Sequence, residues 1–244
     1  MIESSWALAL AVLVIAFLYA SVGHAGASGY IAVMSLFGMT PAAIKPIALG
    51  LNILVASIGT WQFRRAGHFS WTLFWPFALL SVPCAFFGGR WNLPVPLFKS
   101  LVGSVLLFSA WRLIVHPPRD RDPDAPARGV ALGVGAGLGL IAGLTGTGGG
   151  IFLTPILLFR GWARTKTAAA VSAMFILVNS LAGLAGSWSA ATTLPAAGWP
   201  LAVAACAGGA AGSYLGSRRL PPSIIKRVLA VVLTIAGGKL LVGR

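Results

Sequence analysis

The sequence predicts an all-α integral membrane protein made of two tandem, inverted repeats, each a glycine-broken helical hairpin followed by three transmembrane helices. Three observations predict this fold class. The 244 residues are 57% hydrophobic and only 9% charged, whereas a soluble domain carries about 25% charged residues. The apolar runs are continuous and lack the period-2 alternation of β-barrel strands. The pattern of the first half of the chain also returns in the second half, which indicates a duplication.

The first half holds five apolar runs, at residues 6–22, 30–38, 45–61, 71–88 and 97–115. A helix needs about 20 residues to cross about 30 Å of hydrocarbon. The run from Tyr30 to Gly38 is therefore too short to cross alone, whereas the other four approach the required length. We expect residues 30–38 to form the second leg of a broken or re-entrant hairpin whose first leg is 6–22.

The second half repeats this order, with apolar runs at 129–144, 151–159, 168–186, 200–216 and 224–241. Ile53–Ser57 returns as Ile176–Ser180. The segment between the halves is polar and rich in proline, as a joint between two units should be. The sequence therefore divides into an N-terminal transmembrane repeat (1–115), a linker (116–128) and a C-terminal transmembrane repeat (129–244).

The Lys and Arg side chains orient the predicted helices. If each hairpin enters and leaves on one side, the loops at 62–70, 112–128, 160–167 and 217–227 share one face. That face holds 13 of the 18 basic residues: Arg64, Arg65, Arg112, Arg119, Arg121, Arg128, Arg160, Arg164, Lys166, Arg218, Arg219, Lys226 and Arg227. Cytoplasmic loops are enriched in Lys and Arg, so we place this face and the linker in the cytoplasm and both termini outside. The repeats are then inverted; if both short runs instead belonged to full spans, the repeats would be parallel.

Glycine-rich sequences interrupt the two hairpins at equivalent places, Gly23–Tyr30 and Thr145–Ile151. Irregular backbone inside a bilayer is tolerated only where protein or a wet cavity surrounds it. A helix that starts just after Gly29 or Gly150 would direct its first N–H groups and the positive end of its dipole at the break. Two such ends would form an anion site. The candidate substrate-binding residues are the break residues and nearby polar side chains: His24, Gly26, Ser28, Gly29, Asn52, Ser57, Thr145, Gly146, Thr147, Gly148, Gly149, Gly150, Asn179 and Ser180.

These residues also have structural interpretations. Glycine-rich stretches in membrane helices often serve close helix packing. Serines such as Ser57 and Ser172 could bond back to their own helices. Asn52 and Asn179 could brace helix contacts, and His24 could be a structural hydrogen-bond partner. The residues alone leave these alternatives open.

The charged residues restrict the ligand. All acidic residues lie at the terminus or in the linker: Glu3, Asp120, Asp122 and Asp124. A cation site normally uses Asp or Glu inside the membrane, so a small anionic or neutral substrate is favoured. Cys84 and Cys206 have no second ligand at metal-binding spacing, and we expect neither a metal nor a cofactor. Basic loops account for the formal charge of +14, so no nucleic-acid partner is expected.

The second break continues into a recognisable motif, Gly146-Thr147-Gly148-Gly149-Gly150-Ile151-Phe152-Leu153-Thr154-Pro155-Ile156-Leu157, followed by an Ala/Ser-rich helix start at Ala168–Ala173. On these motifs the whole chain resembles the TauE/SafE family of sulfite exporters, also called the toluenesulfonate uptake permease family. The resemblance implies transport of small sulfur-containing anions such as sulfite, sulfoacetate or other organosulfonates. The first break departs from the family pattern, with His24, Ala25, Ala27 and Ser28 where glycines are common and Met34–Leu36 where the proline element would fall. These departures leave the particular substrate open.

We therefore expect a multi-pass inner-membrane secondary transporter, not an enzyme, that works by alternating access at a midplane site. An anion channel is the nearest alternative, since broken helices also line pores, and a structural assembly subunit is another. Gly26–Gly29 also reads as GxSG, which suggests a rhomboid-like serine protease with Ser28 as nucleophile. Against it, the repeat counterpart of Ser28 is glycine, and His68 and His116 lie at or beyond the membrane edges. The expected partners are the lipid bilayer and a small anion, and a homo-oligomer is compatible with the sequence.

Overall fold

The structure, a computed structural model, describes residues 2–39, 41–91, 95–115, 120, 122–187 and 198–242. Over these residues the chain is helical and has no β-strand, which confirms the all-α prediction. The helices are α1 (Ile2–Ser21), α2 (Ala27–Leu36), α3 (Pro41–Arg65), α4 (Trp71–Arg90), α5 (Val95–Val115), α6 (Arg128–Thr145), α7 (Gly150–Phe159), α8 (Thr165–Gly186), α9 (Gly198–Tyr214), its π-helical extension η2 (Leu215–Arg219), and α10 (Pro222–Val242). Of the predicted linker, residues 116–119 and 121 lie outside the described residues.

The helix lengths fit a membrane protein. Within the described residues, four helical segments are long and apolar enough to cross a membrane: Ala43–Arg65, Trp71–Arg90, Arg128–Thr145 and Thr165–Gly186. The predicted short runs form α2 and α7, which have ten residues each and are therefore about 15 Å long. Large apolar side chains such as Leu79, Phe87 and Val203 are exposed, as expected of a surface that contacts lipid.

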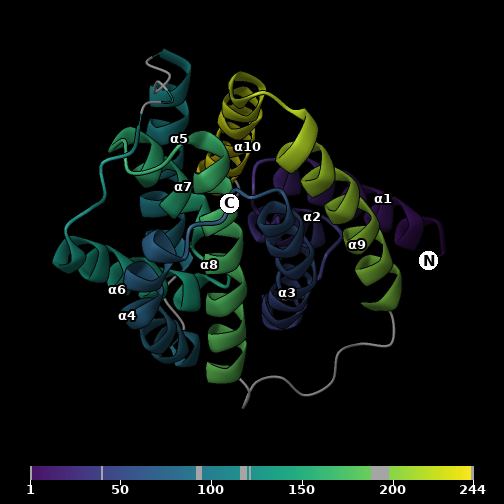
Figure 1. The fold of residues 1–244 in the computed structure, drawn as a ribbon. Coiled ribbons are helices and arrows are strands. Elements are labelled where there is room, and N and C mark those ends of the chain that lie inside the picture. Colours follow the sequence, from purple (N-terminus) through teal and green to yellow (C-terminus); the bar gives the residue numbers. More distant parts are fainter. Residues whose placement is uncertain are drawn as a thin grey trace.

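Helices of one half of the chain pack against helices of the other half (Figure 1). α3 and α8 lie against each other at the centre, and α5 pairs with α10. α4 packs against α6 and α8, whereas α9 packs against α1 and α3. The first helix of each half thus packs against the fourth helix of the other half. The short helices α2 and α7 lie against α3 and α8 respectively.

Glycines allow several of these helices to touch backbone to backbone, and in two pairs the glycines form a regular row. In α6, Cβ atoms placed at three glycines would each lie 2.1–2.2 Å from a carbonyl oxygen of α4: Gly135 from Phe77, Gly139 from Ser81 and Gly143 from Ala85. In α9 and η2, Cβ atoms placed at three glycines would each lie 2.0–2.2 Å from a carbonyl oxygen of α1: Gly208 from Leu13, Gly212 from Phe17 and Gly216 from Ser21. Small residues at four-residue spacing are a common device for close packing of membrane helices. Since the residue numbers rise together in both pairs, α6 runs parallel to α4, and α9 with η2 runs parallel to α1.

Asp120 of the linker joins three elements at one end of the molecule. Its carboxylate accepts hydrogen bonds from the backbone N–H of Thr165 at 2.9 Å and from the Thr165 hydroxyl at 2.7 Å. The Lys226 Nζ atom lies 3.6 Å from the same oxygen. Asp120 therefore caps the start of α8, where a carboxylate is favoured by the free N–H groups and the helix dipole. Asp122 forms an ion pair with Arg164 beside this cap.

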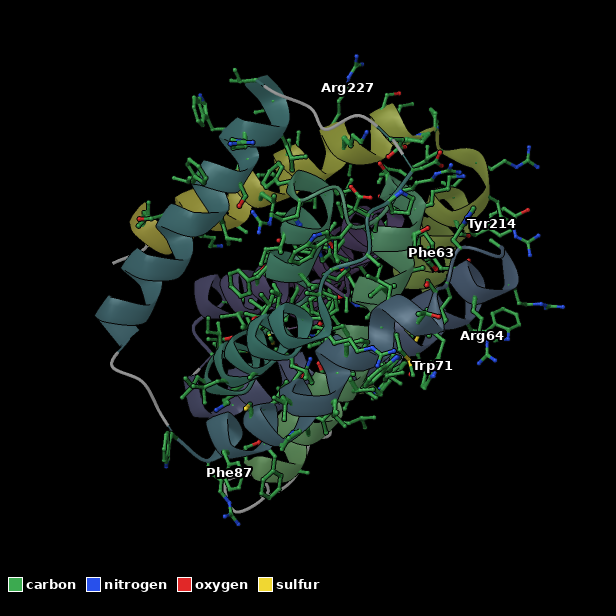
Figure 2. All side chains as sticks on the ribbon, turned by 60° about the vertical axis from the view of Figure 1, so that its left-hand side comes forward. Phe63, Arg64, Trp71, Phe87, Tyr214 and Arg227 are labelled. Carbon is green, nitrogen blue, oxygen red and sulfur yellow. The ribbon has the colours of Figure 1, made fainter. Side chains whose placement is uncertain are left out.

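The Ser217 carbonyl joins further loops at the same end. The His68 Nε2 atom lies 3.0 Å from this oxygen, and the Lys166 Nζ atom donates to it at 3.3 Å. Burial lowers the pKa of His68, and the positive charge of Lys166 lowers it further. The described parts of the four loops that were predicted to share a face are thus in mutual contact, and we call this end the basic face. Figure 2 shows Arg64 at this end of the molecule and Phe87 at the opposite end.

Candidate functional site

Both breaks contain glycines in the left-handed backbone region. In the first break, between α1 and α2, φ is +81° at Gly23 and +103° at Gly26. In the second break, between α6 and α7, φ is +71° at Gly146, +76° at Gly148 and +77° at Gly149. Glycine adopts these angles without the steric cost that a Cβ atom brings. The chain therefore turns twice within a few residues between α1 and α2 and again between α6 and α7.

The start of α2 differs from the sequence prediction. We expected this helix to begin just after Gly29, but it begins at Ala27. The reason is that Gly26 already makes the last left-handed turn, and Ala27 and Ser28 can take helical angles without being glycine. Ser28 and Gly29 therefore lie in the first turn of α2. The second prediction was closer, since α7 begins at Gly150 itself.

Two glycines of the second break are pressed against α8. A Cβ atom at Gly148 would lie 2.7 Å from Cγ2 of Ile176 and 2.9 Å from Oγ of Ser180. A Cβ atom at Gly150 would lie 2.5 Å from Cγ1 and Cδ1 of Ile176 and 3.0 Å from the Ser172 carbonyl oxygen. Real Cβ atoms do not approach neighbours this closely. The second break thus reaches α8 because these residues lack side chains.

His24 links the two breaks. Its side chain is 4% exposed, and its Nε2 atom lies 3.0 Å from the carbonyl oxygen of Gly150. The hydroxyl oxygen of Thr154, one turn along α7, lies 3.2 Å from the same Nε2 atom. Thr154 in turn donates to the Ser172 hydroxyl of α8 at 2.7 Å. This chain of hydrogen bonds fixes the first break against the start of α7.

Hydroxyl groups border the place where the short helices begin. The Tyr19 hydroxyl of α1 lies 2.9 Å from the Ser28 hydroxyl in the first turn of α2. In the second break, the hydroxyls of Thr145 and Thr147 lie 2.7 Å apart, and the Thr147 N–H donates to the Thr145 oxygen at 3.2 Å. Each break therefore presents one hydroxyl, from Ser28 or Thr147, that a second residue holds in place.

A small cavity lies between these groups. Its volume is about 10 Å³, and it is lined by Tyr19, His24, Ala25, Gly26, Ala27, Ser28, Thr147, Ile151 and Ile176. A space of this size holds about one water molecule. Ile176 lies near the middle of the 22-residue helix α8, about 17 Å from its start. The cavity thus lies about halfway through the molecule, at the N-terminal ends of both short helices.

Asn52 and Ser180 lie directly behind the second break. The Asn52 Nδ2 atom donates to the Ser180 hydroxyl at 3.4 Å, and a Cβ atom at Gly148 would lie 3.2 Å from Nδ2. Asn52 is fully buried, and its Oδ1 atom has no hydrogen-bond partner among the described residues. These two residues contact the break but do not line the cavity.

Two predicted residues lie away from this group. Ser57 is exposed, and its hydroxyl donates to the Ile53 carbonyl of its own helix at 2.7 Å. The Asn179 amide accepts from Ser81 of α4 at 2.7 Å and donates to the Phe175 carbonyl at 2.9 Å. Asn179 therefore braces α8 against α4, which is one of the structural alternatives that the sequence left open.

Sequence reasoning missed Tyr19, Thr154 and Ile176. Tyr19 and Thr154 carried a weak signal, because each is an isolated hydroxyl in an apolar run close to a break. Ile176 carried none, since an isoleucine in an apolar helix looks the same whether it packs or borders a cavity. A separate and larger cavity of about 610 Å³ lies at the basic face, between Trp75, Arg128 and Trp162. None of the predicted site residues lines it.

Two comparisons with known proteins give matches over nearly the whole chain. A family model described as "Sulfite exporter TauE/SafE" matches residues 8–240. The chain is also 43% identical over 241 residues to a protein of Sinorhizobium fredii (strain NBRC 101917 / NGR234) named "Probable membrane transporter protein y4hK". That match covers 96% of this chain and 97% of the relative. No solved structure matches the chain.

Proposed function

The chain belongs to the sulfite exporter TauE/SafE family and is a membrane transporter rather than an enzyme, and from this premise we propose that it is a secondary carrier of small sulfur-containing anions, sulfite or organosulfonates such as sulfoacetate. The observation that supports this proposal best is the cavity at the N-terminal ends of α2 and α7. The family description names sulfite, whereas the name of the Sinorhizobium relative names no substrate.

The backbone supplies most of the proposed anion site. The first N–H groups of a helix have no partner within the helix, and the dipole adds positive charge at that end. Ala27 and Ser28 of α2 and Ile151 of α7 lie in the first turns of their helices and line the cavity, and we propose that their N–H groups meet the anion there. The hydroxyls of Ser28 and Thr147 add two donors. No acidic side chain occurs in any of the helices from α2 to α10, so no carboxylate there opposes an anion.

The candidate residues take different parts in this proposal. His24, Gly26, Ser28 and Thr147 line the cavity and are proposed to contact the anion. The others act behind them: Gly29 lies in the first turn of α2, Thr145 holds Thr147, Asn52 and Ser180 contact Gly148, and the glycines at 146, 149 and 150 shape the second break. Ser57 and Asn179 are left out of the proposed site, because their side chains are bonded elsewhere.

The size of the cavity supports alternating access. A space of about 10 Å³ has room for about one water molecule, and a sulfur oxyanion is larger. The helices around the cavity must therefore move before the anion can enter, and we propose that they open to one side of the membrane at a time. An open pore would need no such movement.

Inverted repeats would provide that movement. α3 ends and α8 begins at the basic face, although these helices occupy equivalent places in the two halves. In the same way α4 begins there and α9 with η2 ends there. Equivalent helices thus run in opposite directions, which supports two inverted units, 1–115 and 129–244, joined by the linker 116–128. We place the basic face in the cytoplasm and both termini outside an inner-membrane, multi-pass protein, because Lys and Arg favour that side.

Flux into proteoliposomes tests the proposal. Purified protein is reconstituted, and uptake of sulfite, sulfoacetate, thiosulfate, sulfate and acetate is measured over a range of concentrations. Saturable uptake that one sulfur-containing anion inhibits for another is expected. Linear, unselective flux would identify a channel instead, and saturable uptake of acetate alone would overturn the assignment of the substrate class.

A pair of glycine variants tests the site. Gly149→Val introduces a branched side chain at φ +77°, where even a Cβ atom would lie 3.0 Å from Phe175. Gly133→Val places the same side chain on α6 where a Cβ atom meets nothing within 4 Å. Both variants should insert into membranes, but only Gly149→Val should lose transport. Normal transport by Gly149→Val would rule out the second break as part of the site.

A further inference from the structure

His24 is the ionisable side chain at the centre of the site. It lies between α1 and α2, it is buried, and it borders the cavity. Tyr19 is the other ionisable residue in the lining, and a phenol ordinarily stays neutral near pH 7. Among the described side chains, the other ionisable ones on the surrounding elements do not border the cavity: Tyr30 on α2, Lys45, Arg64 and Arg65 on α3, Lys166 on α8, Cys206 and Tyr214 on α9, Arg218 and Arg219 on η2, and Lys226, Arg227 and Lys239 on α10. α7 carries no ionisable side chain.

The neighbours of His24 determine which ring nitrogen carries the hydrogen. The Gly150 carbonyl oxygen can only accept, so the Nε2 atom 3.0 Å away must donate to it. Thr154 donates its own hydrogen to Ser172, which leaves its oxygen free to accept from the same Nε2–H group at 3.2 Å. Both contacts therefore place the hydrogen on Nε2. In the neutral ring, Nδ1 is then a lone pair without a hydrogen.

The bare Nδ1 atom is the part of His24 that is left for the cavity. It is buried and has no hydrogen-bond partner among the described residues. Gly150 and Thr154, which contact the Nε2 side of the ring, do not line the cavity, whereas His24 does. A lone pair facing an anion is repulsive, because neither group can donate. Once Nδ1 is protonated, the same atom becomes a charged donor and attracts the anion.

We propose that His24 carries the coupling proton of the transporter, so that one proton and one monovalent anion occupy the cavity together. This inference rests on the proposed anion-carrier function. On binding, a proton from the aqueous side adds to the Nδ1 lone pair, and the anion accepts a hydrogen bond from the new N–H group; no other covalent bond forms or breaks. On release, the Nδ1–H bond breaks and the proton leaves with the anion on the other side. Binding of the proton and of the anion favour each other reciprocally.

The movement of one monovalent anion with one proton carries no net charge. A pH difference of one unit should therefore drive about tenfold accumulation of a monovalent anion, and an imposed membrane potential should have no effect. An anion carried alone would respond in the opposite way, to the potential and not to the pH difference.

Proton uptake during binding tests this directly. Methanesulfonate is a suitable probe, because its sulfonate stays ionised over the whole pH range of the assay. Sulfite, sulfoacetate and methanesulfonate are first titrated into detergent-solubilised wild-type protein. If none of them binds, the proposed function itself fails. For a probe that binds, the pH change in weakly buffered solution is expected to show about one proton taken up per anion.

Two variants assign the proton to His24. His24→Gln can still donate to the Gly150 carbonyl, but it has no nitrogen that titrates; its binding of the probe is expected to be weaker, independent of pH and without proton uptake. His68→Gln removes a histidine at the basic face and should keep the uptake of one proton. Binding by wild-type protein without proton uptake, or unchanged proton uptake by His24→Gln, would overturn the inference while leaving the carrier function intact. If His24→Gln does not fold, accumulation of the anion by the wild type, driven by a pH difference and unaffected by membrane potential, decides whether a proton travels with the anion. The variant His24→Asn then replaces His24→Gln. If His24→Asn still couples one proton to each anion, the inference about His24 is overturned.

Discussion

Gly150 offers the sharpest test of the packing that forms the site. A methyl group added there would lie 2.5 Å from two atoms of Ile176 and 3.0 Å from the Ser172 carbonyl oxygen. Two carbon atoms attract best at about 3.5–4.0 Å. In Gly150→Ala, α7 or the Ile176 side chain must therefore move by about 1 Å, which is the difference between these distances.

This displacement acts at the cavity. The Gly150 carbonyl accepts the His24 hydrogen bond, and Ile176 lines the cavity. Overpacking a filled interior costs about 1–3 kcal/mol, and a misplacement of about 1 Å at a functional site can lower a rate about 100-fold. We therefore expect Gly150→Ala to lower anion uptake by about one to two orders of magnitude. The midpoint of thermal unfolding should fall by about 2–4 °C for each kcal/mol lost.

The assay combines uptake into proteoliposomes with thermal unfolding of the same preparation in detergent. Gly137→Ala is the matched control, because a Cβ atom there meets nothing within 4 Å, and alanine is favoured over glycine inside a helix by about 0.5–1 kcal/mol. Ile176→Ala removes both atoms that block the methyl group. The double variant Gly150→Ala/Ile176→Ala should therefore be more stable than the sum of the two single losses predicts. Normal uptake and unfolding by Gly150→Ala would refute the packing argument, and strictly additive losses would refute the contact with Ile176.

Three further predictions concern the scaffold and the basic face. Gly139→Ala should separate α6 from α4 and cost about 1–3 kcal/mol of unfolding free energy, because its Cβ atom would lie 2.2 Å from the Ser81 carbonyl oxygen. If Gly139→Ala unfolds at the same temperature as Gly137→Ala, this prediction is wrong. Asp120→Asn should lose part of the cap of α8, about 0.5–2 kcal/mol, whereas Asp124→Asn should be neutral because Asp124 bonds the Gly161 carbonyl through its backbone N–H. Burial lowers the pKa of His68 below its ordinary 6.5, so the unfolded chain binds this proton more readily. Stability should fall as the pH drops from 6.5 through the folded pKa, and thermal unfolding of His68→Gln should show a weaker dependence over that range; an unchanged slope would show that His68 does not contribute.

The sequence was most informative where glycine was needed for its backbone. The second break was found because glycines that must adopt positive φ, Gly146, Gly148 and Gly149, follow one another closely there. The same reasoning placed the start of α2 three residues too late. Gly29 is a glycine for another reason: its Cβ atom would lie 2.5 Å from Cγ2 of Ile15. A glycine that marks a turn and a glycine that marks a close contact look alike in a sequence.

The side chains of the site were harder to predict, because their roles depend on how each helix is rotated. Ser57 and Asn52 are five residues apart on α3, yet Asn52 is fully buried behind the second break and Ser57 is exposed. Apolar residues surround both, so the hydrophobic pattern of a membrane helix does not show which face meets another helix. In the same way, the rotation of α1 and of α7 about their own axes decides that Tyr19 and Thr154 face the site. Their positions follow from tertiary packing, which the repeat pattern does not encode.

The two halves make the same contact by different means. In the pair α4 and α6, the row of glycines at four-residue spacing that meets the partner's carbonyl oxygens belongs to α6, the first helix of its half, and α4 adds Gly88 against the Leu140 carbonyl oxygen. In the pair α1 and α9, the row belongs to α9 and its extension η2, the fourth helix of its half, while α1 contains no glycine at all. Close approach requires that only one of two helices lack side chains, so either partner can supply the glycines. Both pairs flank the central helices α3 and α8. The spacing of the helices around the cavity is therefore matched on the two sides although the sequences are not, which is what a carrier needs if each half is to move against the other around one shared site.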